Sequence, residues 1–187
     1  KNHILETFPV GEYILSPSAL KLVEKSILSK YGKPLFSKNT IKKIFSSFYH
    51  TTHIFVAKDK NLDDVGYLTS TVTKNIAHDG YVFFDFGGRK LGIFFMISFI
   101  NWSLNKGLKH AYLGTCYGKK SFYKCQYSGF EFFDGIGWSS DLEKLEYLMN
   151  RDEIGNHGHL FQDENYLERF YGHKKLGRIV KRLKNEE

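Results

Sequence analysis

The order in which helical and strand-like periodicities follow one another constrains the fold more than any other feature of this sequence. Apolar residues recur at helical spacing in residues 16–34, which open with a Ser-Pro cap pattern, and again in residues 39–50. Three strand-like runs follow, HIFVAKD, VGYLTSTVT and YVFFDF, separated by a KNLDD turn and an AHDG turn. A glycine pair then precedes a long apolar helix closed by Gly107, and a further strand covers residues 109–115.

This order predicts an α+β fold. An antiparallel meander, a glycine turn, a buried helix and a strand parallel to the last one form the core of the acetyltransferase-like (GNAT) fold, whose mostly antiparallel sheet is splayed and flanked by helices. The length fits one domain over residues 1–187. Within it we expect N-terminal helices in residues 1–50, a core in residues 51–140 and a basic helical tail in residues 141–187.

The charge balance indicates an anionic partner. The formal net charge is +7, which suits nucleic acid, a phosphate-bearing cofactor or an anionic lipid. Part of the excess lies in the C-terminal HKKLGRIVKRLKNEE, a pattern equally typical of a solvated helix face. The longest apolar run, LGIFFMISFINWSL, spans about fourteen residues, fewer than a bilayer requires. We therefore expect no membrane association.

The cysteines and histidines do not predict a metal site. Cys116 and Cys125 are nine residues apart, which fits no zinc signature. His157 and His159 stand in a glycine loop without a clear third ligand. Two cysteines and no signal-peptide pattern favour the reducing cytoplasm.

A phosphate-binding loop is one interpretation of the GGRKLGIFF segment. In the acetyltransferase-like fold, backbone N–H groups at the start of the main helix face a pyrophosphate. Arg89 and Gly92 match the loop pattern, whereas Phe94 occupies a position where a small residue is usual. A plain turn between strand and helix, with Phe94 facing the core, is the other interpretation.

The strands on either side of this helix carry the candidate catalytic groups. Tyr112 and Gly114 stand at the end of HAYLGTC, where a glycine lets a substrate approach the backbone closely. Asp85, at the end of YVFFDF, faces them across the splayed strands and is suited to take a proton from an amine. Capping of the following helix is the alternative role for Asp85.

The stretch from His110 to Trp138 resembles the arginyl-tRNA protein transferases and their bacterial leucyl-transferring relatives. Their C-terminal halves carry YYLG, a short loop, K-M-x-Y-K-x-Q-[YF]-S-P and then DG-x-W. This chain has AYLG, then FEFFDGIGW, and between them the matching positions Lys120, Tyr123, Lys124, Gln126, Tyr127 and Ser128. The upstream YVFFDFGGRKLGIFFMISFINWSLNKGLK is similar as well, so that the resemblance covers residues 53–140.

The resemblance implies an aminoacyltransferase that moves an amino acid from aminoacyl-tRNA to the amine of a protein or peptide, with no cofactor. The activated ester needs placement and oxyanion donors rather than a nucleophilic side chain. Gln126 would bind the aminoacyl group or the acceptor backbone. Lysines would contact phosphates and tyrosines would stack on bases; these residues are Lys119, Lys120, Lys124, Tyr123 and Tyr127. Surface solubility for the lysines and core packing for the rings are the alternatives.

Two other functions fit the same residues. Phe122-Tyr123 before Gly129-Phe130 is similar to a helix near the acyl-donor site of ordinary acetyltransferases, which implies a coenzyme A dependent N-acetyltransferase using acetyl-CoA, with Tyr123 as general acid. The charge and the aromatic residues would also suit a non-catalytic RNA-binding module.

Overall fold

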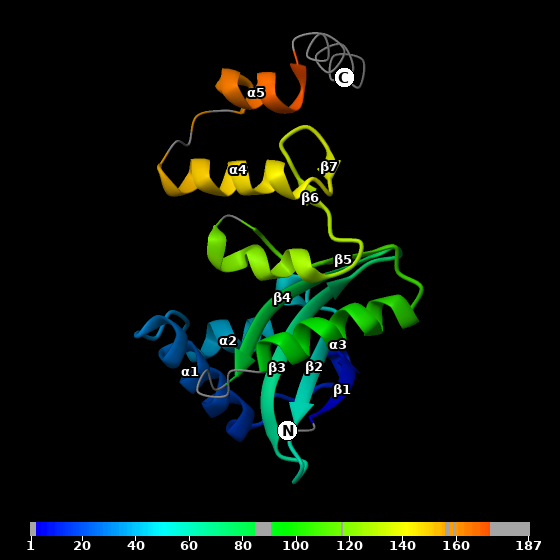
Figure 1. Ribbon diagram of the computed structural model, residues 1–187. Helices are drawn as coiled ribbons and strands as arrows, with labels where there is room; N and C mark the ends of the chain where they lie inside the picture. Colours follow the sequence, from blue (N-terminus) through cyan, green and yellow to red (C-terminus); the bar gives the residue numbers. More distant parts are fainter. Residues whose placement is uncertain (1–2, 85–90, 117, 156–157, 159, 173–187) are drawn as a thin grey trace. The chain divides into compact units, whose positions relative to one another are not determined.

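The computed structural model describes residues 3–84, 91–116, 118–155, 158 and 160–172. The chain forms two compact units, Lys1–Gly114 (unit 1) and Thr115–Glu187 (unit 2), each with a hydrophobic core of its own (Figure 1). The single domain expected over residues 1–187 stays a prediction.

Unit 1 is built on a five-stranded sheet whose strands lie in chain order. The first four strands are antiparallel neighbours, and β5 runs parallel to β4. A crossover containing α3 (Leu91–Asn105) joins β4 to β5. Strand order and crossover confirm the predicted α+β class with its acetyltransferase-like core. The strands are β1 (Ile4–Pro9), β2 (His53–Lys58), β3 (Asp64–Val72), β4 (Ile76–Phe84) and β5 (His110–Tyr112).

Two hydrophobic cores lie on opposite faces of this sheet, because successive side chains of a strand alternate between faces. Val56 packs with the buried residues of α1 (Pro17–Tyr31) and α2 (Lys38–Ile44). Phe55, its neighbour in β2, packs with those of α3. Figure 1 accordingly shows α3 in front of the strands, whereas α1 and α2 cover the other face.

Local capping explains where the first two helices begin and end. The Ser16 hydroxyl accepts the N–H three residues on at 3.1 Å, and Gly32, at φ +69°, ends α1, as the sequence predicts. The second helix starts at Lys38, one residue before the predicted range of residues 39–50, because Ser37 caps it.

The structure corrects four local predictions. Residues 4–9 form β1, which the sequence analysis missed; its polar residues suit an edge strand, which has a partner on one side only. AHDG is not a turn: it lies within β4, and the reversal precedes Ile76. The strand expected over residues 109–115 is shorter, since Gly114 turns the chain at φ +72°. Phe48, within the predicted helical stretch of residues 39–50, lies beyond the end of α2 and is 63% exposed.

Unit 2 contains short elements around a small core. Phe132, Leu145 and Met149 are its buried hydrophobic cluster. Residues KKSFYKCQ form the 3₁₀ segment η3 (Lys119–Gln126). The further elements are η1 (Val10–Glu12) and η2 (Ser47–Tyr49) in unit 1, and η3 (Lys119–Gln126), β6 (Phe132–Phe133), β7 (Trp138–Ser139), α4 (Leu142–Glu153), η4 (Leu160–Gln162) and α5 (Glu164–Phe170) in unit 2.

Two α-helices lie in the described part of residues 141–187. Asp141 caps α4, because its carboxylate accepts two N–H groups of the first turn. α5 is helical as expected, while residues 173–187 of the predicted basic tail lie outside the described residues.

Candidate functional site

The candidate site in unit 1 is the place where β4 and β5 part. Their parallel pairing runs from Ile76 opposite His110 to His78 opposite Tyr112 and ends there. β4 continues to Phe84, so that within the described residues no strand lies on the β5 side of residues 80–83, which we call the open β4 edge. The splay expected from the sequence is therefore present.

A β-bulge shapes the open β4 edge. The register between β3 and β4 shifts between Leu68 and Ser70, where the single residue Thr69 faces both Gly80 and Tyr81. The Thr69 hydroxyl accepts the Tyr81 N–H at 2.9 Å, replacing a normal ladder bond. Such a bulge bends the strand and redirects its backbone groups.

Gly80 is required at this bulge by close approach. A Cβ at this position would lie 2.8 Å from the Thr69 hydroxyl oxygen and 2.9 Å from its carbonyl oxygen. Sequence reasoning assigned this glycine to a turn. An isolated glycine between strand-like residues is, however, the signal by which a bulge can be recognised.

The end of β4 is held by α1. The buried hydroxyl of Ser26 accepts the Phe84 N–H at 2.9 Å, and Ser26 is 2% exposed. Sequence reasoning missed this residue, because an isolated serine on the inner face of a helix does not reveal its partner. Its effect is to fix the strand end that precedes the crossover to α3.

Two titratable rings lie where β4 and β5 part. The ring centroids of His78 and Tyr112 are 6.1 Å apart, His78 is exposed and Tyr112 is half-buried. An imidazole can accept a proton and a phenol can donate one. Gly114 follows in an exposed turn with positive φ, which by itself accounts for a glycine there.

The start of α3 bears on the phosphate-binding interpretation. Phe94 is half-buried in the core on the α3 face, where its ring is 5.4 Å from that of His3 and 6.0 Å from that of Phe95. A Cβ at Gly92 would lie 3.4 Å from the Phe84 ring, an ordinary van der Waals contact, so packing alone does not require a glycine there. Phe94 thus faces the core, as the interpretation of a plain turn between strand and helix expected.

Two predicted site residues of unit 1, Asp85 and Arg89, lie outside the described residues. Their roles stay predictions.

The lysines of unit 2 make local contacts. The Lys119 ammonium lies 3.0 Å from Glu153, and Lys124 donates to the Thr115 carbonyl at 2.8 Å. Lys120 is exposed. Two of the three lysines assigned to phosphates therefore already have partners in the protein.

The remaining predicted residues of unit 2 lie on or next to η3. Gln126 is exposed and Tyr123 is 46% exposed, whereas Tyr127 is half-buried and its hydroxyl oxygen is buried. Their roles stay predictions.

The DG-x-W motif closes a turn. One carboxylate oxygen of Asp134 accepts the N–H groups of Ile136 and Gly137 at 2.9 and 2.8 Å, while the other accepts Lys144 at 2.8 Å and the hydroxyl of Tyr171. Burial alone would raise the pKa of Asp134, but these hydrogen bonds outweigh it and hold that pKa below the ordinary value. The motif thus has a structural role in unit 2.

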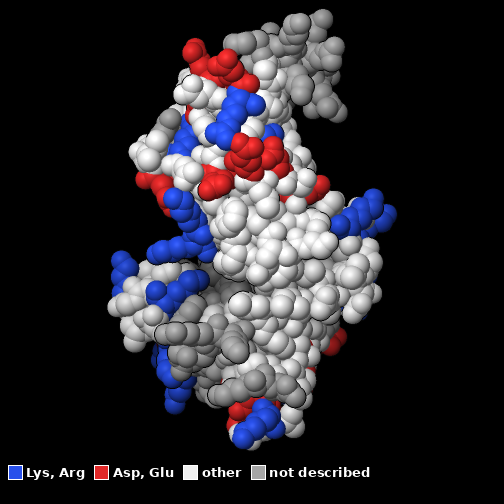
Figure 2. Space-filling view, in the orientation of Figure 1, with Lys and Arg blue, Asp and Glu red and all other residues white. Residues whose placement is uncertain are grey.

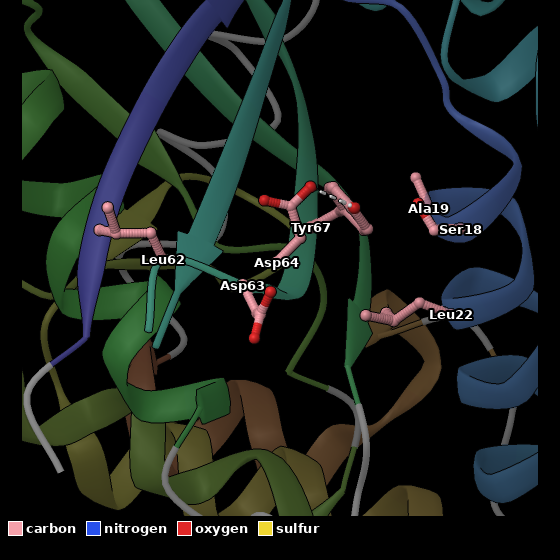
Figure 3. Close-up of a pocket in the computed structure, with 7 residues that line it drawn as sticks. All are labelled: Ser18, Ala19, Leu22, Leu62, Asp63, Asp64 and Tyr67. Carbon is pink, nitrogen blue, oxygen red and sulfur yellow. Dashed lines mark hydrogen bonds between the residues drawn. The ribbon is translucent and has the colours of Figure 1, made fainter. Parts of the chain in front are cut away.

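An open cavity of about 310 Å³ lies elsewhere in unit 1, between α1 and the turn from β2 to β3 (Figure 3). Asp64, in its wall, accepts the Tyr67 hydroxyl at 2.8 Å and pairs with Lys58 at 3.2 Å. No residue of β4 or β5 lines it. Since the Asp64 carboxylate already has two partners and no residue of the open β4 edge lines the cavity, we assign the cavity no catalytic role.

Metal and membrane signals are absent from the residues that the structure describes. Among them, no group of three or more His, Cys, Asp or Glu side chains could hold a metal ion. None of the helices in these ranges combines the length and apolar character needed to cross a bilayer.

Comparisons with known proteins concern the fold. No family model matches the chain, and no curated protein matches its sequence. An acetyltransferase from Trypanosoma brucei is similar over 71% of this chain and 96% of its own length, at 16% identity and a TM-score of 0.45. The ribosomal-protein-S18-alanine N-acetyltransferase of Escherichia coli is similar over 56% of this chain and 63% of its own length, at 12% identity and a TM-score of 0.40. A tetramutant of the BH1408 protein of Bacillus halodurans is similar over 70% of this chain and 99% of its own length, at 13% identity and a TM-score of 0.40.

The fold class follows from the strand order and the α3 crossover described above. The resemblance to arginyl-tRNA protein transferases stays a prediction.

Proposed function

We propose that this chain is an N-acyltransferase that transfers an acyl group to an amine at the open β4 edge. The observation that carries the proposal is the parting of β4 and β5 beside the bulge at Gly80. A strand edge of this kind presents backbone donors and acceptors to an extended amide-containing ligand, as an additional strand would. The bulge adds a bend at which the reacting carbonyl can lie.

The acyl donor in this proposal is acetyl-CoA. Phe94 packs against the core on the α3 face. In this proposal the N–H groups of Leu91 and Gly92, in the first turn of α3, would hold the pyrophosphate of the donor. When bound, acetyl-CoA would supply a thioester, whose acyl group is already activated for attack by an amine.

Aminoacyl-tRNA has less support as the donor. Lys119 and Lys124, which that function would place on phosphates, are engaged with Glu153 and the Thr115 carbonyl. Transfer from tRNA was the first expectation from the sequence, and the unit 2 contacts weigh against it. Coenzyme A, the alternative donor from the sequence, is therefore preferred.

The residues where the strands part perform the proton transfers in this proposal. An incoming amine must lose one proton as its nitrogen forms the new C–N bond, and the sulfur must gain one as the C–S bond breaks. His78 accepts the first proton, and Tyr112 donates the second. The thioester needs no nucleophilic side chain, so positioning and proton transfer are the contributions required of the protein.

Donor binding provides the test. Acetyl-CoA should raise the melting temperature in a concentration-dependent way, and radiolabelled acetyl groups should appear on an amine from a panel of peptides and polyamines. Stabilisation by charged tRNA but not by acetyl-CoA would restore the aminoacyl function. No stabilisation by either donor, and no transfer, would overturn the proposal.

Alanine variants of Gly80 and Gly11 provide a matched test of the bulge. In Gly80→Ala the new Cβ would clash with the Thr69 backbone and distort the bulge, whereas Gly11→Ala adds a methyl group with no atom within 4 Å. We expect Gly80→Ala to lose acetyl-CoA stabilisation and Gly11→Ala to retain it. If Gly80→Ala does not fold, Thr69→Val removes the hydroxyl that holds the bulge at nearly unchanged volume.

A further inference from the structure

The segment containing α1 and α2 carries a strong positive charge. Between Pro17 and His50 the chain has seven lysines and a single acidic residue, Glu24, giving a formal charge of +6 in a chain whose total is +7. The lysines are Lys21, Lys25, Lys30, Lys33, Lys38, Lys42 and Lys43. The other charges of the chain therefore nearly cancel, and this segment dominates the net charge.

All seven of these lysines are exposed. The apolar side of α1, with Ala19, Val23 and Ile27, is buried against the sheet, and so are Ile41 and Ile44 of α2. The lysines consequently occupy the outer side of both helices. Figure 2 shows Lys and Arg side chains gathered over this part of unit 1.

Aromatic rings are exposed among these lysines. Tyr31 is 48% exposed, Phe48 63% and Tyr49 47%. The Lys43 ammonium lies 4.6 Å from the centre of the Phe48 ring, and that of Lys30 lies 5.1 Å from the centre of the Tyr31 ring. The surface therefore presents cations and flat rings side by side.

We propose that this surface, the exposed lysines and rings of residues 17–50, binds single-stranded nucleic acid. Lysines neutralise backbone phosphates, while exposed rings stack on unpaired bases. The site lies outside the open β4 edge and does not depend on the acyltransferase proposal.

The burial of the apolar helix face and the exposed aromatic rings favour single-stranded nucleic acid over an anionic membrane or an acidic protein. Membrane-surface helices insert an apolar face, but the apolar face of α1 is already buried in the protein core. An acidic protein surface would pair with the lysines and would leave Phe48 and Tyr49 exposed. Only unpaired bases use both the charges and the rings.

Fluorescence anisotropy with labelled oligo(U) and oligo(dT) over a salt series tests this surface. The triple variant Lys21→Ala, Lys38→Ala and Lys42→Ala should bind more weakly and with a shallower salt dependence, by about 2 in the log–log slope at about 0.7 per phosphate contact. Phe48→Ala should weaken binding about tenfold with little change in slope.

The control variant carries the same charge change at lysines outside residues 17–50. The lysines are Lys60, Lys74 and Lys109, which are exposed. Their triple replacement by alanine should leave the affinity within about twofold of wild type, because only a weak non-specific electrostatic attraction is lost.

Three results would overturn the proposal. One is no binding of either oligonucleotide at low salt. Another is an equal loss of affinity in the two triple variants, which would reduce the effect to net charge. The third is binding to phosphatidylserine vesicles, but not to the oligonucleotides, with loss in the Lys21, Lys38 and Lys42 variant. Preference between oligo(U) and oligo(dT) identifies which nucleic acid is bound, and melting curves of each variant verify folding.

Discussion

Replacement of Asp134 by alanine should strongly destabilise unit 2. The Asp134 side chain is 3% exposed and that of Lys144 11%, and their charged atoms are 2.8 Å apart. Asp134→Ala removes the carboxylate that also holds the N–H groups of Ile136 and Gly137. The Lys144 ammonium then stays buried without its carboxylate. The hydrogen bond that it donates to the Tyr171 hydroxyl in the wild-type structure, at 3.1 Å, does not replace the lost charge.

Burial sets the magnitude of this loss. Removing one member of a buried ion pair costs about 3–5 kcal/mol, because the remaining charge is dehydrated without compensation. The exposed pair of Lys119 and Glu153, with side chains 60% and 44% exposed, provides a contrast within the same unit. Glu153→Ala should cost about 1 kcal/mol or less.

Urea denaturation followed by circular dichroism measures both losses, and amide exchange at Ile136 and Gly137 localises the first one to the turn. The double variant Asp134→Asn with Lys144→Met removes both charges while keeping an acceptor oxygen for the turn. It should be more stable than Asp134→Ala. Equal small losses for Asp134→Ala and Glu153→Ala would refute the reasoning from burial.

The same carboxylate should make unit 2 sensitive to acid. The pKa of Asp134 is lower in the folded state than the ordinary value of 3.8, so its stabilising contribution is fully present above that value. The contribution is lost as the pH falls from the ordinary value through the lowered one. In Asp134→Asn the acid-induced fall in the free energy of unfolding should be smaller over this range.

Three further changes test the packing of unit 1 by thermal and urea denaturation. In Gly66→Ala a Cβ would lie 2.9 Å from the Phe95 ring and 3.0 Å from the Phe83 carbonyl, so we expect a loss of about 1–3 kcal/mol. Ser26→Ala removes the buried acceptor of the Phe84 N–H and should cost about 1–3 kcal/mol. Loss of the α1 cap in Ser16→Ala should cost about 1 kcal/mol. Wild-type stability in any of these variants would contradict the contact concerned.

Much of the fold could be predicted because its signals are local. The Ser16 cap, the Gly32 and Gly107 ends and the apolar period of α3 all arise from residues within a few positions of each other. Local signals also misled the prediction at β4. The residues AHDG resemble a turn, but pairing with β3 on one side and β5 on the other keeps them extended.

The candidate site was predicted less completely. The sequence indicated the splayed strands and three residues of the candidate site. In the structure Tyr112 and Gly114 lie at or just after the end of β5, and Gly92 lies at the start of α3. It missed Gly80 and Thr69, whose roles exist only where β3 lies beside β4. The lysines and rings of residues 17–50 were visible in the sequence, but their common exposure was not.

The sequence alone determined most of the order of helices and strands, both ends of α1 and the class of fold, because capping, glycine conformation and hydrophobic period act over a few residues. Only the tertiary structure decided that residues 4–9 join the sheet, that β4 bulges at Gly80 and that Asp134 is neutralised by Lys144. Each of these depends on a partner whose identity is set by packing rather than by spacing along the chain. Long-range contacts therefore shaped the site, and local ones the elements that carry it.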